Sequence, residues 1–387
     1  MPDLKFEFAS ATRIIFGAGK IKEIGSLAAG MGNRALVIIG VRNTKAEQLV
    51  NMLREHNVTV TALDVTSEPS VSFMQQVLIA ASQAECDLVI GFGGGSAMDT
   101  AKAAAALLKN QGDIYDYLEV IGKALPLKNR PLPCIAIPTT AGTGAEVTRN
   151  AVLTSPEQRV KVSLRSPLML PVLALVDPEL TLDLPREITA STGLDALTQV
   201  IEPFVSNAAN PLTDALCKEG MARAARSLRR AYHSGKDIQA REDLCITSLF
   251  GGLALANAKL GAVHGFAGVL GGMFPGPHGA ICARLLPLVI ESNLDALKRR
   301  EPSNPAINRL EEVARILTGN PNAGAVDGLA WINDLAAELV VPSLSAYGLT
   351  AANIPEVVEK SAKASSMKGN PIVLTDEEMH VILERAL

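Results

Sequence analysis

The chain has 387 residues, 48% hydrophobic and 20% charged, which is enough for two domains with substantial cores. A net charge of -4, with no basic run longer than three residues, argues against a nucleic-acid partner. Five cysteines without CxxC spacing predict no disulfide framework and fit a reducing cytoplasm. The N-terminal MPDLKFEFAS lacks the apolar core of a signal peptide, and no apolar stretch approaches the ~18 residues of a membrane span, so we expect a cytoplasmic location without membrane contact.

The first half of the chain alternates between strand-like and helix-like runs. A first strand is expected before the turn at Gly17 and Gly19. Apolar and β-branched runs predict further strands at 35–39, 58–63, 87–91, 135–137 and 173–176, with helices at 44–56 and 71–84. This alternation predicts a parallel sheet with crossover helices. Because the strands are apolar almost throughout, both faces of the sheet should be covered.

After Pro185 the pattern changes to segments that are rich in alanine and leucine and have helical period. The clearest are 188–206, 211–234 and 239–260, and no strand is predicted among them. We therefore expect two domains, an α/β domain at 1–183 and an all-helical domain at 184–387.

A triplet of glycines, Gly93 to Gly95, follows the strand at 87–91 and precedes a helix. Glycines let the backbone approach a pyrophosphate without a Cβ clash, and a helix N-terminus favours an anion. Ser96 is predicted to cap this helix, with Asp99 as the acidic half of a capping box. An ordinary strand-to-helix turn is the alternative interpretation.

A second polar loop, PTTAGTGAE at 138–146, follows the strand at 135–137. Its threonines, Thr139, Thr140 and Thr143, suit contacts to ribose and phosphate. In open α/β sheets the ligand crevice lies at the carboxyl ends of the strands. A surface turn remains the alternative, although two such loops favour a nucleotide site.

Asp195, His264 and His278 form the candidate metal site. The two histidines lie 14 residues apart in a glycine-rich apolar segment, where imidazole fills space poorly. Imidazoles and a carboxylate are usual ligands of a catalytic divalent metal. Gln199 lies one helical turn after Asp195, on the same helix face, where a further ligand would complete the site. Two core histidines bonded to the backbone are the alternative.

These motifs together resemble the iron-containing (group III) alcohol dehydrogenase family. The resemblance rests on GGGSAMDTAK at 93–102, PTTAGTGAEVT at 138–148, Lys161, DPELT at 177–181, TGLDAL at 192–197, the histidine-glycine segment at 264–287 and GNPIVLT at 369–375. It implies a dinucleotide-binding α/β domain and a helical domain, an architecture similar to that of dehydroquinate synthase. It also implies reversible hydride transfer between a nicotinamide and an alcohol or carbonyl carbon, with the active site in the cleft between the domains.

The resemblance assigns roles residue by residue. Gly94, Gly95 and Ser96 would hold the pyrophosphate of NAD(P). The residues that would line the rest of the cofactor are Thr139, Thr140, Thr143, Lys161 and Leu180.

Asp195, His264 and His278 match three of the family's four metal ligands, iron or zinc being expected. The sequence departs from the family pattern at two positions, Gln199 and Gly268, where histidines are usual. With Gln199, either a site of three ligands plus an amide survives, or His264 and Gln199 polarise the substrate oxygen without a metal.

Three functions follow. The first is an NAD(P)-dependent, metal-assisted alcohol dehydrogenase or aldehyde reductase that acts on a small-molecule alcohol or aldehyde. The second is a metal-independent reductase of the same fold, similar to maleylacetate reductases. The third is a cofactor-binding protein without turnover. The family resemblance implies a homodimer.

The end of the strand at 35–39 bears on the choice between NAD and NADP. In many members of the resembled family an aspartate follows this strand and would accept the ribose 2′-hydroxyl. Here Gly40 occupies that position, which removes the repulsion of a 2′-phosphate and makes room for it. Arg42 could supply a guanidinium to that phosphate, so NADP(H) is expected.

Overall fold

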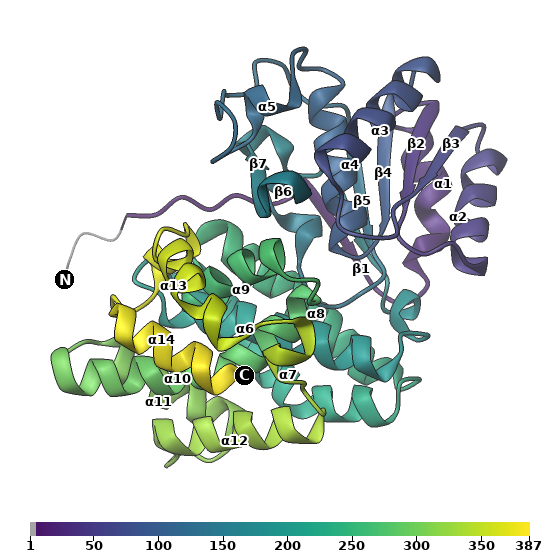
Figure 1. Cartoon of the computed structure of the whole chain (residues 1–387). Helices are drawn as coiled ribbons and strands as arrows, with labels where there is room; N and C mark the ends of the chain where they lie inside the picture. Colours follow the sequence, from purple (N-terminus) through teal and green to yellow (C-terminus); the bar gives the residue numbers. More distant parts are fainter. Residues whose placement is uncertain (1–4) are drawn as a thin grey trace. The chain divides into compact units, whose positions relative to one another are not determined.

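The computed structural model describes residues 5–387, and the chain divides into two compact units (Figure 1). The α/β unit comprises Ser10–Thr140 and Gly144–Leu182. The helical unit comprises Asp183–Leu387 together with Ala141–Thr143 and the described residues before Ser10. These last two segments come from the first half of the chain, and the predicted boundary at 183 assigned both of them to the α/β domain. The predicted absence of a signal peptide falls partly on residues 1–4, which lie outside the described residues.

The α/β unit contains a sheet of six parallel strands in the order β1-β8-β5-β4-β2-β3. The strands are β1 (Arg13–Phe16), β2 (Arg34–Ile39), β3 (Thr59–Asp64), β4 (Leu88–Gly93), β5 (Cys134–Pro138) and β8 (Leu173–Val176). The helices are α1 (Ile24–Ala29), α2 (Thr44–Glu55), α3 (Val71–Gln83), α4 (Gly95–Leu107) and the short α5 (Ile114–Tyr117). The predicted parallel sheet with crossover helices is confirmed.

Both faces of the sheet are buried, as the apolar strands predict. Successive side chains of a strand point to opposite faces. In β2, Leu36 and Ile38 therefore belong to one core with α3 and α4, whereas Val37 and Ile39 belong to a second core with α1 and α2. Full burial of each such side chain contributes roughly 1.5–3 kcal/mol. Figure 1 shows these helices around the sheet.

α2 and α4 follow the neighbouring strands β2 and β4 and pack on opposite faces of the sheet. β2 and β4 are neighbours, with Ile39 opposite Phe92 in the register. The loop after β2 leads to α2 on one face, and the loop after β4 leads to α4 on the other. Where successive connections leave a parallel sheet on opposite faces, the carboxyl ends of the strands bound a crevice that commonly binds ligands.

An antiparallel hairpin of β6 (Asn150–Ser155) and β7 (Val160–Arg165) was not predicted. Its buried residues alternate along β6, at Ala151, Leu153 and Ser155. Arg159 turns the chain in the left-handed region, with φ of 52°. Alternating residues around a Pro-containing turn were the available signal, but the run is more polar than the sheet strands.

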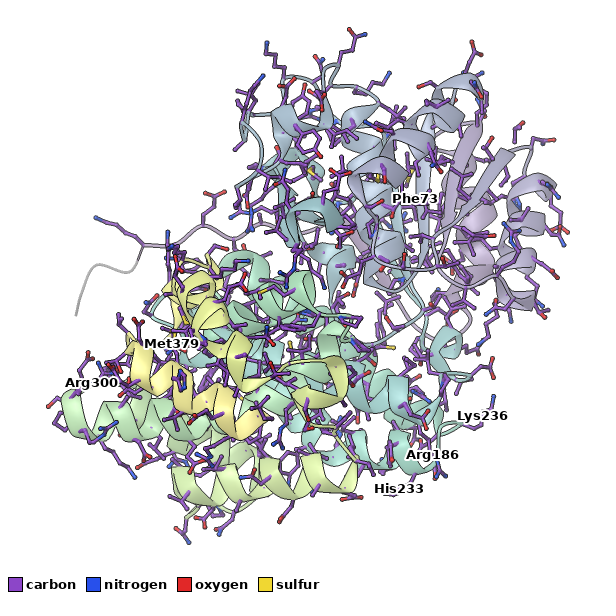
Figure 2. All side chains as sticks on the ribbon, viewed as in Figure 1. Phe73, Arg186, His233, Lys236, Arg300 and Met379 are labelled. Carbon is purple, nitrogen blue, oxygen red and sulfur yellow. The ribbon has the colours of Figure 1, made fainter. Side chains whose placement is uncertain are left out.

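The helical unit contains no strand in its described part, as predicted. Its helices are α6 (Arg186–Val205), α7 (Pro211–His233), α8 (Ile238–Asn257), α9 (Ala262–Met273), α10 (His278–Arg300), α11 (Ala306–Thr318), α12 (Ala325–Glu338), α13 (Ile354–Ala362) and α14 (Asp376–Ala386). Charged side chains such as Lys236 and Arg300 extend from this unit (Figure 2). Among the described residues no single helix has the length and hydropathy of a membrane span, and only α8 and α9 reach them jointly, across a bend of 96°.

Candidate nucleotide loops and metal centre

The glycine loop after β4 packs tightly against the end of β2. Gly93 has φ of +156°, and a Cβ built on it would lie 2.9 Å from Gly40 Cα and 2.8 Å from Ala97 Cβ. In the same way, a Cβ on Gly40 would lie 3.1 Å from Gly93 Cα. A side chain at position 40 would therefore point at the glycine loop. Gly40 does not provide the open space for a 2′-phosphate that the sequence suggested.

The N-terminus of α4 has no side-chain cap. The cap position is occupied by Gly94, with no side-chain hydrogen bond, and Ser96 lies inside the first turn. The prediction that Ser96 caps this helix, with Asp99 completing a capping box, is therefore wrong. First-turn N–H groups have no acceptor within a helix. Without a side-chain cap, this terminus can bind an anion such as a phosphate.

Asp99 instead belongs to a buried polar cluster behind the loop. Its carboxylate lies 3.1 Å from the Nζ of Lys102, a fully buried lysine that also donates to Thr148 Oγ1 at 3.0 Å. Burial raises the pKa of Asp99, although Lys102 opposes the shift. Asp99 thus holds Lys102 under the loop and has no contact that points to a cofactor role of its own.

The threonine loop begins next to the glycine loop at the end of β5. Thr139 N donates to Gly93 O at 2.8 Å. A Cβ on Gly94 would lie 3.3 Å from Thr140 Oγ1. The structure therefore brings these predicted cofactor residues together at the carboxyl edge of the sheet. Thr143 belongs to the helical unit.

Lys161 and Leu180 lie elsewhere in the α/β unit. Lys161 is on β7, and its Nζ forms an ion pair with Glu68 Oε1 at 2.5 Å. Leu180 lies in a short 3₁₀ turn, Pro178–Thr181, and packs in the core with α1 and α2.

Arg42 follows β2 directly before the cap of α2, Asn43. Its Nε donates to both carboxylate oxygens of Asp64, at 3.0 and 2.9 Å, and its Nη2 lies 2.8 Å from Oδ1. Asp64 ends β3, opposite Ile39 in the register. The sequence analysis missed this aspartate, which lies 22 residues away from Arg42 in the chain.

The metal-site candidates meet in the helical unit. Asp195 is on α6, His264 on α9 and His278 at the start of α10. Ligand atoms of these residues and of Cys282, one turn further along α10, all lie within 4.8 Å of one another. The close approach of α10 to α6 depends on Gly279, since a Cβ there would lie 2.5 Å from Ser191 O.

Three buried atoms of this cluster lack hydrogen-bond partners within the described part of the chain: Asp195 Oδ1, Gln199 Oε1 and His264 Nε2. Asp195 Oδ1 and His264 Nε2 lie 3.4 Å apart. An unpaired buried polar group costs about 1–3 kcal/mol, so three together need an explanation. A divalent cation would satisfy all three, and the donor set of carboxylate, imidazole and amide fits one chemically.

Glu202 positions His264 and was not identified from the sequence. One carboxylate oxygen lies 2.6 Å from His264 Nδ1, and the other accepts from Val263 N at 2.7 Å. A carboxylate on Nδ1 fixes the tautomer and directs Nε2 at a metal. Although burial lowers the pKa of His264, Cys282, Glu202 and Asp195 raise it well above its usual value. Carboxylates on both sides of the ring, Asp195 and Glu202, therefore favour positive charge at His264.

Gln199 faces the same cluster from α6. Its Nε2 donates to Gly142 O at 3.2 Å, which leaves Oε1 as the unpaired atom. Gly268, the second departure from the family pattern, lies on α9, and a Cβ there would meet no atom within 4 Å among the described residues. A larger side chain at 268 would therefore find space without a clash.

The chain is similar to known proteins over nearly its whole length. Residues 11–178 match the family model for iron-containing alcohol dehydrogenase, and residues 189–387 match the model for the C-terminal part of the Fe-containing alcohol dehydrogenase family. A 1,3-propanediol dehydrogenase of Klebsiella pneumoniae is 32% identical, with 98% of each chain covered.

Solved structures agree. A 1,3-propanediol oxidoreductase has a TM-score of 0.91 at 31% identity, covering 99% of this chain and 100% of the other. A sulfoacetaldehyde reductase from Bifidobacterium kashiwanohense in complex with NAD+ has a TM-score of 0.86 at 30% identity, covering 98% of each chain. The fold and the alcohol dehydrogenase or aldehyde reductase activity predicted from the motifs are confirmed, and the chain belongs to the iron-containing alcohol dehydrogenase family.

Proposed function

We propose that the chain catalyses reversible, NAD(P)-dependent hydride transfer between a small alcohol and its aldehyde, with the help of a divalent metal held by Asp195, His264 and His278. The observation that carries the metal is the set of unpaired buried atoms, Asp195 Oδ1, Gln199 Oε1 and His264 Nε2. Burying three polar atoms without partners is unfavourable, and a bound cation would offset that cost.

The reaction places negative charge on the substrate oxygen during reduction. When bound, a divalent metal supplies a Lewis acid for that oxygen, and a nicotinamide carries the hydride. Glu202 holds His264 in the tautomer that presents a lone pair at Nε2. Gln199 Oε1 adds a neutral donor to the same cluster. The uncapped N-terminus of α4 and the glycine loop bind the pyrophosphate.

Metal analysis of the purified protein, paired with oxidation of NADH and NADPH against a panel of aldehydes, tests this function. We expect bound divalent metal, turnover and loss of turnover with a chelator. Turnover without metal, unchanged by chelation, would favour the metal-independent reductase. Cofactor binding without turnover on any aldehyde would favour a binding protein. The glycine loop and the metal donors belong to different units, so cofactor binding and metal binding can be measured separately.

We further propose that NADP(H) is the preferred cofactor. Gly40 places no carboxylate at the end of β2, and Arg42 lies two residues on. Asp64 engages the Nε and Nη2 edge of Arg42. A guanidinium carries five donors, so the Nη1 side can bind a 2′-phosphate while Asp64 fixes the orientation of the planar group.

The ratio of kcat/KM for NADPH and NADH tests this preference. Arg42→Glu should lower the ratio at least about tenfold, which corresponds to about 1.4 kcal/mol. Arg54→Glu serves as a charge-matched control, because Arg54 lies in the last turn of α2, at the opposite end from Arg42. A wild type that prefers NADH, or an unchanged ratio in Arg42→Glu, would remove Arg42 from the cofactor site.

The homodimer implied by the resemblance and the cytoplasmic location expected from the composition stay predictions. Light scattering of the purified protein tests the first, and fractionation of cells that express the chain tests the second.

A further inference from the structure

Cys282 lies inside the donor cluster, although no motif in the sequence pointed to it. It is buried on α10, one turn after His278, and its Sγ lies 3.7 Å from His278 Nε2. Two side chains four residues apart on a helix share one face. The same helix therefore directs an imidazole and a thiol at the same point.

Two of the six distances among these four ligand atoms match the edges of a tetrahedral zinc site. Bond lengths of about 2.0–2.1 Å to nitrogen or oxygen and about 2.3 Å to sulfur set nitrogen and oxygen ligands about 3.4 Å apart and sulfur and nitrogen about 3.6 Å apart. The structure has 3.4 Å between His264 Nε2 and Asp195 Oδ1, and 3.7 Å between Cys282 Sγ and His278 Nε2. Every other pair of ligand atoms among the four residues lies within 4.8 Å.

We propose that Cys282 is the fourth protein ligand of the metal, so that this chain holds its ion by Asp195, His264, His278 and a thiolate. The proposal rests on the metal-assisted function proposed above and specifies the ligand set of that same centre. The amide nitrogen of Gln199 donates to Gly142 O, and its Oε1 stays beside the cluster as a weaker neutral donor.

Metal binding at Cys282 involves no change of oxidation state. The S–H bond breaks, a sulfur–metal bond forms, and the proton leaves to solvent. A thiolate and one carboxylate together neutralise a divalent ion, which suits a buried site. A thiolate also shifts the choice of metal, because sulfur ligands favour zinc over the harder divalent ions. We therefore expect zinc to be retained more tightly than iron(II).

X-ray absorption fine structure of the zinc-loaded wild-type protein tests the ligand set without a substitution. We expect one sulfur scatterer at about 2.3 Å, together with a nitrogen and oxygen shell at about 2.0–2.1 Å. A first shell of nitrogen and oxygen alone would overturn the proposal and leave the metal-assisted function intact. A protein that binds no zinc at all would contradict that function as well.

Cobalt(II) spectra of variants provide an independent test. Wild-type protein should show a near-ultraviolet sulfur-to-cobalt charge-transfer band, which Cys282→Ser should lose. Cys217→Ser is the matched control, since Cys217 is equally buried in the same unit, on α7, and should leave the band unchanged. Gln199→Ala should also retain the band. A band that survives in Cys282→Ser would come from another sulfur ligand and would overturn the proposal, as would a wild-type protein that binds cobalt without this band.

Discussion

The nucleotide loops and the donor cluster use different parts of the polypeptide. The loops of the α/β unit consist mainly of backbone, with close contacts between Gly93 and Gly40 and an uncapped helix terminus. The donor cluster of the helical unit consists of side chains from α6, α9 and α10. A backbone site tolerates changes of side chain but depends on the absence of Cβ atoms. A side-chain site depends on the identity of each donor and can exchange one ligand for another while keeping its fold.

This difference also explains why the two sites departed from expectation in different ways. The glycine loop is a continuous sequence motif, and the errors there concerned the capping roles of Ser96 and Asp99 and the space at Gly40. In the cluster, Gln199 replaces the usual histidine, while Cys282 lies within reach of the same point. Four substitutions test this difference between the two sites.

Asp195→Ala should have the largest effect. Removal of a metal ligand should strip the bound metal and lower kcat/KM by at least about 100-fold, because even the loss of an outer-shell partner costs about 10- to 100-fold. The binding of NADPH, measured by fluorescence, should stay at the wild-type affinity. Metal content measured by mass spectrometry completes the test. Full metal content in this variant would show that the cluster is not the metal centre.

Gly94→Val addresses the backbone site. Its Cβ would approach Thr140 Oγ1 to 3.3 Å, and the branched side chain would fill the space above the helix terminus. We expect the Kd for cofactor to rise at least about 100-fold, equal to about 2.7 kcal/mol, with unchanged metal content. Gly30→Val is the control in the same unit, because the nearest atom to its Cβ is 3.6 Å away. Normal cofactor affinity in Gly94→Val would contradict the loop assignment.

Glu202→Gln should weaken the metal site without removing a ligand. The amide cannot accept hydrogen bonds at both positions that face Val263 N and His264 Nδ1. We expect metal affinity to fall about 10- to 100-fold, measured by competition with a chelator. Glu219→Gln, at an exposed ion pair on α7, controls for loss of charge. Equal losses of metal affinity in the two variants would reduce Glu202 to a general electrostatic role.

Glu146→Gln tests a buried carboxylate in the other unit, with an effect on stability. Burial raises the pKa of Glu146 from 4.5 to about 7. Well below pH 4.5 the carboxyl is protonated in both the folded and the unfolded state. Between pH 4.5 and about 7 the unfolded state ionises while the folded state stays protonated, so the free energy of unfolding should fall by about 3 kcal/mol across this range and change little above it. Urea unfolding at about pH 5 and about pH 8 should show this loss in wild type and in the exposed control Glu157→Gln. If Glu146→Gln keeps the same loss, another group is responsible.

Much of the fold could be predicted from hydrophobic periodicity, because the spacing of apolar residues within a single strand or helix shows which of its faces is buried. The hairpin at β6 and β7 escaped because its alternation is partly polar, at residues such as Thr154 and Lys161. In the cluster, Asp195, His264 and His278 were predicted from residue type and spacing, and the family resemblance agreed with them. Glu202 and Cys282 stand one turn from predicted ligands, at i+3 of Gln199 and i+4 of His278, so a search for donors at helical spacing would have found both. The ion pair of Arg42 with Asp64 depends on strand order, which sequence alone does not reveal.

The segment Ala141–Thr143 limits how this enzyme can be recombined with its relatives. It is encoded in the middle of the α/β half, yet it packs in the helical unit, where Gly142 O accepts from Gln199 and a Cβ on Gly142 would lie 2.8 Å from Thr192 Cβ. A fragment that starts at residue 184 would lack Ala141–Thr143, expose the surface of α6 that Gly142 contacts, and leave the amide of Gln199 without its acceptor. A chimaera that exchanges the helical units must therefore include these three residues. Otherwise the residue at position 199, beside the donor cluster, would contact a loop from the other parent.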